Sequence, residues 1–419
     1  MNILVIGSGG REHTLFHKLT ESPQADKVYA IPGNPGMGEM TDISIEDNAE
    51  ILRFAKEKEI GLVVVGPEVP LMNGLVDELE SAGIRAFGPR ANAAEIEGSK
   101  SFAKDLMKKY GIPTARYEVF TEAEPARAYI RREGAPIVVK ADGLAAGKGV
   151  IVAMSEQEAL DAVNAIMEDN SFGDAGARVV IEEFMEGEEA SLLAFTDGKT
   201  IRPMISAQDH KRAFDGDKGP NTGGMGTYAP APVMTPEMIE RVTEEILKPT
   251  LAAMAKEGRP YSGCLYLGLM ITVEGPKVVE FNARFGDPET QVVLPLLDGD
   301  LVQIMCACAD GTLADVPIHW KDGAAVCVVL AAGGYPAAYE KGNEIHGIAD
   351  AEKTGALVFH AGTAAKEGKL VTNGGRVLGV VGMGEDIASA VRSAYAAVEK
   401  ISFKDAYYRK DIAHRALHR

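Results

Sequence analysis

The segment from Ile137 to Val152 constrains the fold most, because two apolar stretches flank a loop built almost entirely of small residues. The first stretch ends at Lys140, the loop continues Ala-Asp-Gly-Leu-Ala-Ala-Gly-Lys-Gly, and the second stretch begins at Val150. This pattern predicts a strand, a loop and a second strand. Gly and Ala let backbone amides approach an anion closely, and two lysines add positive charge. The segment therefore indicates a loop that covers the phosphates of ATP, with an exposed hairpin carrying solvated lysines as the alternative.

The Walker A phosphate loop does not fit this segment. That motif has four residues between its glycines and a Ser or Thr after its lysine. Here only three residues separate Gly143 from Gly147, and Lys148 is followed by Gly149. The chain also continues as a strand where the motif requires a helix. Spacing, chemistry and context therefore exclude a Walker site at this position.

Length and charge limit the classes of function. A chain of 419 residues exceeds the size at which one core stops growing, so several domains are expected. The net charge of -18 argues against nucleic-acid or membrane binding, since both depend on a basic surface. The first residues lack a secretory signal, and the four cysteines lack metal-site spacing. We therefore expect a cytoplasmic protein that acts on small molecules.

The first hundred residues alternate between apolar strands and amphipathic helices. Strands are expected at residues 3–6, 27–30, 62–65 and 85–87, with helices between them. This alternation predicts a parallel α/β domain. Its first turn, Gly7-Ser-Gly-Gly-Arg-Glu-His13, resembles a dinucleotide fingerprint but carries Glu12 at the third glycine position. We expect the amides of Gly9, Gly10 and Arg11 to favour an anion at a helix N-terminus, while a tight packing turn is an equal alternative.

Charged residues are densest in the segment Val278 to Glu289, which continues an apolar strand as Glu-Phe-Asn-Ala-Arg-Phe-Gly-Asp-Pro-Glu. Strand alternation places Glu280 and Asn282 on one face. Their oxygens suit a hard divalent cation that also binds phosphates. This segment therefore predicts a metal site of Glu280 and Asn282, with Mg²⁺ or Mn²⁺ as the ion.

Two further segments are candidates for substrate contacts. A strand at Val179 runs into an acidic turn that ends at Glu189, where carboxylates suit ribose hydroxyls or are simply solvated. Residues 206–226 form a long polar, Gly-rich segment without periodicity, which we interpret as a substrate loop. No Ser-His-Asp or Cys-His nucleophile pattern is evident. The chemistry predicted is ATP with a divalent metal activating a carboxylate.

These motifs, in this order, resemble the phosphoribosylamine-glycine ligase family of the ATP-grasp superfamily over essentially the whole chain. The strings Gly219-Pro-Asn-Thr-Gly-Gly-Met-Gly226 and Arg284-Phe-Gly-Asp-Pro-Glu289 carry most of the resemblance. It implies an ATP-dependent carbon-nitrogen ligase of purine biosynthesis, which forms glycinamide ribonucleotide through a glycyl phosphate. It also implies an α/β chain with an ATP-grasp fold, an N-terminal Rossmann-like parallel-sheet domain and a small C-terminal α/β domain. We place these domains at residues 1–102, 103–312 and 320–419, with a mobile lid at about 120–190.

The resemblance also implies roles for individual residues. Glycine activation is assigned to Arg284, Asp209 and Lys211. Glu280 and Asn282 match the metal positions, although the upstream strand 265–270 lacks the further acidic ligand of many relatives. ATP contacts are expected from Lys100, Lys140, Gly143, Gly147, Lys148, Gly149, Glu182, Phe184 and Glu189. Contacts with phosphoribosylamine and glycine are expected from Gly9, Gly10, Arg11, Glu68, Asn221, Gly223, Gly224, Asp287, Glu289 and Arg376.

Three alternatives stay open at this point. Another ATP-grasp ligase or carboxylase would share the phosphate loop and the metal strand but need not carry residues 219–226. A non-catalytic nucleotide-binding protein would not require the cluster of metal and acid residues. A nicotinamide oxidoreductase rests only on the opening glycines. The sequence does not choose between a monomer, which we expect, and a homodimer.

Overall fold

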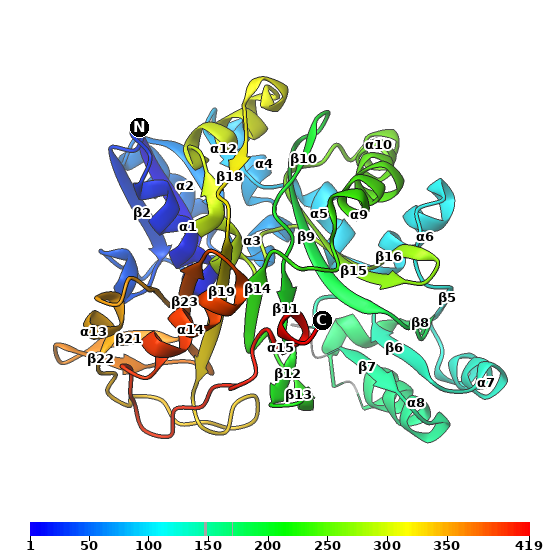
Figure 1. Ribbon diagram of the computed structural model, residues 1–419. Helices are drawn as coiled ribbons and strands as arrows, with labels where there is room; N and C mark the ends of the chain where they lie inside the picture. Colours follow the sequence, from blue (N-terminus) through cyan, green and yellow to red (C-terminus); the bar gives the residue numbers. More distant parts are fainter. Residues whose placement is uncertain (146–148, 170) are drawn as a thin grey trace.

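A computed structural model describes residues 1–145, 149–169 and 171–419 of the chain (Figure 1). Over these residues it shows four sheets of four or five strands and three two-stranded sheets, and four clusters of buried apolar side chains form the core. Among the described residues, no helix is both long and apolar enough to cross a membrane.

The N-terminal region is the predicted parallel sheet, in the order β2-β1-β3-β4. Strands alternate with helices because each apolar strand is followed by a Gly- or Pro-containing turn and an amphipathic segment. The predicted helix after the first glycine turn is confirmed. The elements are β1 (Asn2–Gly7), α1 (Gly10–Thr20), β2 (Lys27–Pro32), α2 (Asn48–Glu57), β3 (Ile60–Val65), α3 (Glu68–Met72), α4 (Leu75–Ser81), β4 (Arg85–Phe87) and α5 (Ala91–Gly98).

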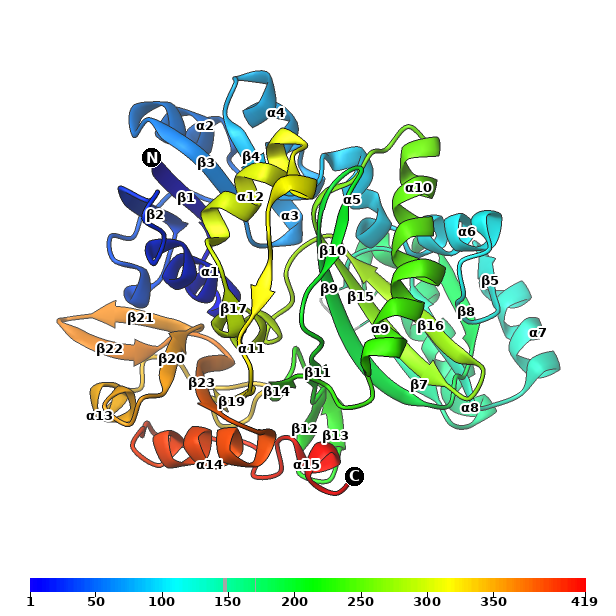
Figure 2. The same cartoon turned by 45° about the horizontal axis from the view of Figure 1, so that its top comes forward.

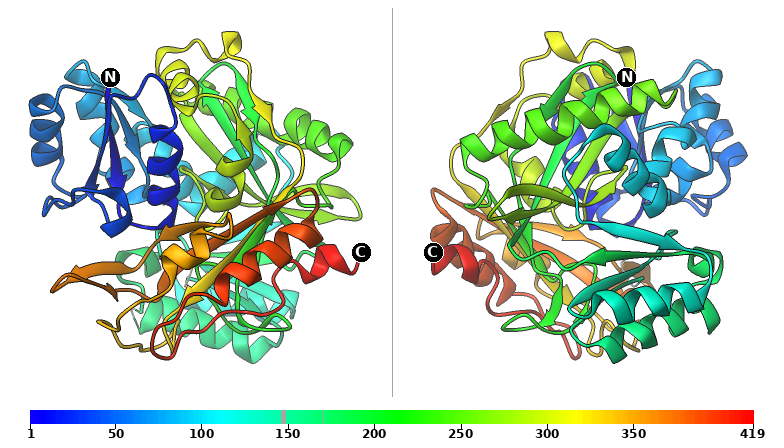
Figure 3. Two further views of the ribbon diagram at one scale, coloured as in Figure 1. Left: turned by 60° about the vertical axis from the view of Figure 1, so that its left-hand side comes forward. Right: turned by 90° about the vertical axis from the view of Figure 1, so that its right-hand side faces the viewer.

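Residues 117–183 form a separate lobe, which the right-hand view of Figure 3 shows clearly. The predicted strand pair at the phosphate loop is confirmed, since β6 and β7 are antiparallel partners with Lys140 opposite Val150. Ile137 and Val139 face the lobe's helices, whereas Val138 and Lys140 line the cleft. The sheet has the order β5-β8-β6-β7. The elements are β5 (Tyr117–Phe120), α7 (Ala123–Glu133), β6 (Ile137–Ala141), β7 (Val150–Ala153), α8 (Glu156–Val163) and β8 (Val179–Glu183).

An antiparallel sheet in the order β10-β9-β15-β16 lies opposite this lobe. Successive residues of β15 alternate between two apolar clusters, so helices cover both faces, with α9 and α10 on one face (Figure 2) and α12 on the other. The elements are α6 (Lys100–Tyr110), β9 (Glu188–Asp197), β10 (Ile201–Pro203), α9 (Pro236–Val242), α10 (Lys248–Lys256), β15 (Ser262–Thr272), β16 (Gly275–Asn282) and α12 (Leu301–Asp310).

The C-terminal sheet, in the order β11-β14-β19-β23-β20, packs between α14 and α11. The strands predicted near residues 325–331, 357–360 and 377–381 are confirmed. The elements are β11 (Gln208–Asp209), β14 (Gly226–Ala229), α11 (Thr290–Val293), β17 (Leu297–Asp298), β18 (His319–Trp320), β19 (Ala324–Ala331), α13 (Ile348–Glu352), β20 (Leu357–His360), β21 (Thr363–Lys366), β22 (Lys369–Thr372), β23 (Arg376–Gly384), α14 (Ile387–Val398) and α15 (His414–Leu417).

The Gly-rich segment 206–226 differs from the irregular loop predicted for it. It contains β11, a hairpin of β12 (Arg212–Phe214) and β13 (Lys218–Asn221), and it runs into β14. Strand β14 pairs with β19, about a hundred residues further along the chain. The segment lacks a local hydrophobic period because its order comes from this long-range pairing.

Candidate active site

The cleft between the sheets contains two adjoining cavities, of about 360 Å³ and about 1000 Å³. We call the smaller one, which reaches Glu68 and Arg284, the inner chamber, and the larger one, which reaches Phe184 and residues 414–419, the outer chamber. Both chambers are lined by the same central set, Lys140, Glu182, Asp209, Lys211 and Glu280. Most of the side chains predicted for the site therefore meet in one continuous cleft.

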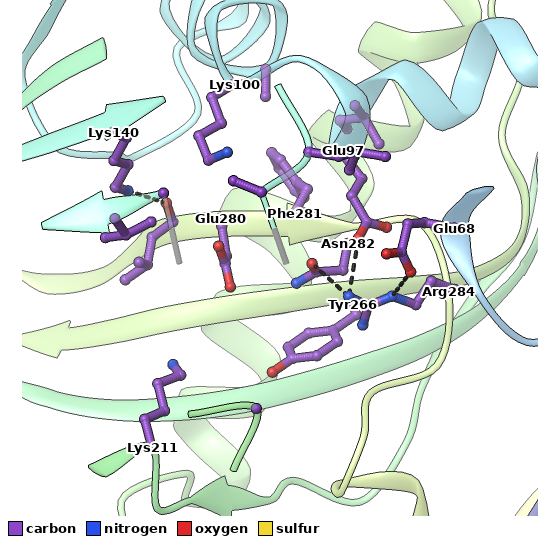
Figure 4. Close-up of a pocket in the computed structure, with 18 of the residues that line it drawn as sticks. Glu68, Glu97, Lys100, Lys140, Lys211, Tyr266, Glu280, Phe281, Asn282 and Arg284 are labelled. Atoms are coloured by element: carbon purple, nitrogen blue, oxygen red, sulfur yellow. Dashed lines mark hydrogen bonds and ion pairs between the residues drawn. The ribbon is translucent and has the colours of Figure 1, made fainter. Parts of the chain in front are cut away.

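Glu280 and Asn282 project from β16 into the inner chamber (Figure 4). Glu280 points into the space between Lys100, Lys140 and Lys211, and among the described residues it forms no ion pair. The Oδ1 atom of Asn282 accepts a hydrogen bond from Nη2 of Arg284 at 3.3 Å. The two oxygen-bearing side chains therefore share a face of the strand, as strand alternation predicts.

Lys100 begins α6 because Ser99 and Asp142 cap that helix. Ser99 Oγ accepts the Phe102 amide at 3.2 Å, and Asp142 Oδ1 accepts the Ser101 amide at 2.6 Å. Asp142 follows β6, so the cap joins the helix to the base of the phosphate loop. Burial lowers the pKa of Lys100, against the opposing charge of Glu280. The cap thereby fixes a buried amine at the mouth of the loop, where its Nζ donates to the Gly143 carbonyl at 2.9 Å.

Glu182 lies between two lysines. Its Oε1 is 2.9 Å from Lys140 Nζ, and its Oε2 is 3.1 Å from Lys104 Nζ. Burial alone would raise the pKa of Glu182, but the two ammonium groups hold it below its usual value. Burial also lowers the pKa of Lys104 to about 8. Glu182 is therefore an anion that fixes Lys140, and the ATP contact expected of it remains a prediction.

Asp209, Lys211 and Glu189 form a second charged group on the opposite side of the cleft. Lys211 Nζ lies 2.9 Å from Glu189 Oε2 and 3.8 Å from Asp209 Oδ1. Burial raises the pKa of Asp209 to about 6 in spite of this cation. The Lys211 ammonium holds the pKa of Glu189 below its usual value. Lys211 thus stands between the two chambers with a carboxylate on each side.

Arg284 is held by two carboxylates in the inner chamber. Its Nη2 lies 3.0 Å from Glu97 Oε1 and its Nε lies 3.4 Å from Glu68 Oε2. Burial would lower the pKa of Arg284, but Glu97 and Glu68 raise it. Burial raises the pKa of Glu97, which also accepts the Ala283 amide at 2.6 Å. The guanidinium is therefore fixed in position before any substrate arrives.

Arg376 joins three parts of the chain at the far end of the inner chamber. Its Nη1 donates to the carbonyl oxygens of Gly223 and Asp287, each at 3.0 Å, and lies 3.5 Å from Asp287 Oδ1. Asp287 also accepts the Arg11 amide at 3.4 Å. Gly223 has no room for a side chain, since a Cβ atom there would lie 2.8 Å from the guanidinium carbon. The three predicted substrate residues Asp287, Arg376 and Gly223 are thus brought together.

Glu289 is buried beside Tyr266. The Tyr266 hydroxyl donates to Glu289 Oε1 at 2.5 Å, and Ser191 Oγ donates to the same oxygen at 3.3 Å. Tyr266 stands opposite Asn282 in the pairing of β15 with β16. A carboxylate held by two hydroxyl donors, next to Asn282, suits the ammonium group of a small amino acid.

The N-terminal glycine turn is packed around a carboxylate of its own. The Gly9 amide donates to Glu12 Oε2 at 2.7 Å, so this carboxylate caps the start of α1. Glu12 also fills the space beside Gly7 and Gly66, where a Cβ atom would come within 2.3 Å and 2.2 Å of it. These contacts support the packing-turn alternative for Gly7, while the substrate contacts expected of Gly9, Gly10 and Arg11 remain a prediction; Arg11 lines the inner chamber.

Other predicted residues are placed as follows. Phe184 and Asn221 line the outer chamber, and Gly149 lines the inner one. Gly9, Gly10, Gly143 and Gly224 are not among the described lining residues. Gly147 and Lys148 lie outside the described residues. Within residues 1–145, 149–169 and 171–419, no group of three His, Cys, Asp or Glu side chains has metal-binding geometry.

The cleft residues that sequence reasoning missed include Glu97, Lys104, Tyr266 and Arg415. Glu97 comes three residues before Lys100, and Lys104 is one helical turn after it, so helix geometry could have found Lys104. Tyr266 is signalled only by the pairing of β15 with β16. Arg415 carries no motif, and only the tertiary structure brings it to the outer chamber.

The fold and the cleft together define an ATP-grasp protein. The chain superposes on biotin carboxylase from Campylobacter jejuni, solved as a complex with β,γ-ATP, with a TM-score of 0.73 at 15% identity, covering 97% of this chain and 92% of that one. At that identity the likeness concerns the fold alone. The family model for the ATP-grasp (A) domain of phosphoribosylglycinamide synthetase matches residues 98–290.

The particular family follows from the rest of the chain. The N-domain and C-domain models of phosphoribosylglycinamide synthetase match residues 1–97 and 325–415. Phosphoribosylamine–glycine ligase of Agrobacterium fabrum is 54% identical over 422 residues, covering 100% of this chain and 99% of the relative. The crystal structure of that ligase from Thermotoga maritima superposes with a TM-score of 0.87 at 38% identity, covering 99% and 100% of the two chains. The chain belongs to the phosphoribosylglycinamide synthetase family.

Proposed function

We propose that this chain joins 5-phosphoribosylamine to glycine at the expense of ATP, giving glycinamide ribonucleotide, ADP and phosphate in purine biosynthesis. One observation carries the proposal beyond family membership: Lys100, Lys140 and Lys211 surround Glu280, and Arg284 lies in the same cleft. Three cations around one carboxylate, with a fourth nearby in the cleft, suit polyphosphate chemistry, because developing negative charge needs fixed positive groups. A carboxylate is a poor electrophile, so ATP is needed to give it a leaving group.

In the first step, a glycine carboxylate oxygen attacks the γ-phosphorus of ATP. The bond between that phosphorus and the β,γ-bridging oxygen breaks, so glycyl phosphate forms and ADP leaves. We assign Lys100 and Lys140 to the ATP phosphates, and Arg284 and Lys211 to the transferring group. Asp209 and Glu289 would hold the glycine ammonium from the side of the cleft opposite Lys100. The fixed position of Arg284 between Glu68 and Glu97 supports this, because catalysis by charge requires donors placed in advance.

In the second step, the amine of phosphoribosylamine attacks the carbonyl carbon of glycyl phosphate. The carbon-nitrogen bond forms, the bond from that carbon to the phosphoryl oxygen breaks so that inorganic phosphate leaves, and the proton lost by the amine passes to the departing phosphate. We place the amine at Glu68 and the ribose phosphate at Arg376, with Asp287 orienting the guanidinium. Burial would raise the pKa of Glu68, but Arg284 and Arg11 keep it below its usual value, so Glu68 is an anion that can hold the amine.

Glu280 and Asn282 fit a divalent cation. They supply a carboxylate and an amide oxygen from one strand face, and hard cations such as Mg²⁺ are commonly held by one or two such ligands together with substrate phosphates. When bound, Mg²⁺ or Mn²⁺ would neutralise charge on the ATP phosphates. We expect the enzyme to work in the cytoplasm on free small molecules, as a monomer or a homodimer.

An assay of ADP release tests the proposal. The complete mixture of ATP, Mg²⁺, glycine and phosphoribosylamine should release ADP, and omission of either glycine or phosphoribosylamine should abolish steady turnover. Mass spectrometry of the product should detect glycinamide ribonucleotide. ADP release of equal size without glycine would contradict the proposal and favour another ATP-grasp activity.

A further inference from the structure

The hairpin β12–β13 is held by residues 407–415, which are distant in sequence. Arg409 is completely buried, and its Nη1 donates to the Arg212 carbonyl at 3.1 Å. Its Nη2 lies 3.0 Å from Asp217 Oδ1 and 2.8 Å from Asp411 Oδ2. The Gly216 amide donates to Asp411 at 2.8 Å. A buried arginine that bridges two carboxylates and a carbonyl fixes the hairpin firmly against this segment.

The same segment reaches the strand that carries Asp209 and Lys211. The Ala413 amide donates to Nε2 of His210 at 3.0 Å, which leaves the ring proton of neutral His210 on Nδ1. Burial lowers the pKa of His210, so the neutral form is expected. The His414 ring lies 5.3 Å from the His210 ring. The residue between Asp209 and Lys211 is thus anchored to the segment that follows it by two hundred positions.

Beyond this anchor, the chain forms part of the outer chamber. His414, Arg415, His418 and Arg419 line it together with Glu188 and Glu189. Arg415 Nη2 lies 2.8 Å from Asp217 Oδ2, and Arg419 Nη1 lies 3.3 Å from Glu188 Oε1. Figures 1 and 2 show α15 beside the hairpin β12–β13. The chamber is therefore bounded by residues 414–419 together with the lobe strands, the start of β9, the segment 209–222 and parts of β15 and β16.

We propose that residues 414–419 form a wall of the nucleotide site and that Arg415 is a nucleotide-binding residue on the ribose side. This rests on the proposed function, in which ATP is the substrate and several of the residues expected to contact it, Lys140, Glu182, Phe184 and Glu189, line the outer chamber. Of the cations that line this chamber, Lys211 and Arg415 lower the pKa of Glu189 the most. Glu189 is the residue expected at the ribose hydroxyls. Asp217, which lines the same chamber, holds Arg415 by an ion pair, so the guanidinium is fixed at the chamber wall before the nucleotide binds. The positive charge of Arg415 also helps Lys211 to lower the pKa of Glu189.

The test is calorimetric binding of ATP, ADP, 2′-deoxy-ATP and 3′-deoxy-ATP to the full chain. Arg415→Ala should weaken ATP and ADP about tenfold, the scale of one lost charge-assisted hydrogen bond. It should also reduce the difference in affinity between ATP and whichever of 2′-deoxy-ATP and 3′-deoxy-ATP the wild type binds more weakly. Arg415→Lys should recover part of the affinity. The KM for glycine should stay unchanged.

Arg85→Ala is the matched control, because Arg85 also forms a partly exposed ion pair, with Asp310 at 2.8 Å, and does not line the cleft. Its nucleotide affinity should equal that of the wild type. Wild-type affinity and sugar preference in folded Arg415→Ala would overturn the inference, as would a lowered melting temperature with unchanged binding. If Arg415→Ala does not fold, Arg415→Lys with unchanged sugar preference would overturn it. Failure of the wild type to bind ATP would instead overturn the proposed function.

Discussion

Two glutamates near strand ends, Glu12 after β1 and Glu280 on β16, have opposite surroundings. Glu12 accepts the Gly9 amide and the Nε of Arg11, the latter at 2.5 Å, and it is almost completely buried. Glu280 projects into the cleft among three lysines and, within the described residues, forms no ion pair of its own. In the sequence, the glycine turn around Glu12 indicates an anion site, and the segment around Glu280 indicates a cation site. Only the surroundings of the two side chains in the structure distinguish their roles.

The difference teaches that a carboxylate near a strand end can take a metal ion where no cation of the fold already pairs with it. The hydrogen bonds of Glu12 stabilise the turn, and its carboxylate is already engaged by the Gly9 amide and by Arg11. Glu280 can take a cation because the neighbouring lysines are held by other acids, Lys140 by Glu182 and Lys211 by Glu189. Asp287 lies between these two cases. It accepts the Arg11 amide of the turn, as Glu12 accepts the Gly9 amide, and it still faces the cleft beside Arg376.

Of the substitutions that test this comparison, the substitution of Glu280 should have the largest effect. Glu280→Ala should lower kcat by about 1000-fold, because a fixed group that serves phosphoryl transfer is lost, while the free energy of unfolding changes little. Steady-state ADP release at saturating Mg²⁺ measures this. Glu274→Ala, at the exposed turn of the same hairpin, is the control and should retain full activity. Near-normal turnover of Glu280→Ala would refute the metal assignment.

Substitution of Glu12 should affect stability instead. Glu12→Ala leaves the buried Arg11 and the Gly9 amide without their carboxylate, which should cost about 3 kcal/mol of unfolding free energy. Urea unfolding followed by circular dichroism checks the value. At low temperature, the folded variant should keep most of its ATP affinity. If ATP binding were lost while stability stayed unchanged, Glu12 would belong to the site and the comparison would fail.

Substitution of Arg376 should give a smaller, substrate-specific effect. Arg376→Ala should raise the KM for phosphoribosylamine about tenfold, because a charged hydrogen bond to the phosphate is lost. The Kd for ATP should not change, since Arg376 lies in the inner chamber, apart from the outer one. Initial rates at varied phosphoribosylamine measure the first quantity. An unchanged KM would contradict the phosphate role.

The smallest effect concerns a third carboxylate with a structural role, Asp217. His210, Arg415 and Arg409 hold the pKa of Asp217 well below the usual 3.8. The folded-state pKa is lower than the unfolded one, so the stabilisation is present above the unfolded pKa and is lost as pH falls through the folded pKa. Asp217→Asn should therefore be less stable than the wild type at pH 7. The difference in unfolding free energy between the two proteins should narrow below about pH 4. Urea midpoints at several pH values test this, and a constant gap would contradict it.

Much of the fold could be predicted from local pattern. The hairpin of β6 and β7 was predictable because small residues between two apolar runs leave few alternatives. The parallel N-terminal sheet followed from the alternation of strands and helices. The hairpin β12–β13 and strand β14 were not predictable, because their pairing partners lie elsewhere in the chain. Glu280 and Asn282 were placed on one face correctly, since that depends only on the period of a strand.

The sequence by itself determined the strand and helix alternation of the N-terminal sheet, the ATP-grasp family and the residue types of the site, because these follow from local periodicity and from motif strings. Only the tertiary structure decided which charged side chains pair with other groups of the protein and which charged side chains face the cleft. It paired Glu12 with the glycine turn, Glu97 with Arg284 and Asp217 with Arg415. The physical reason is that a charge's availability depends on neighbours within a few ångströms, and those neighbours come from distant parts of the chain.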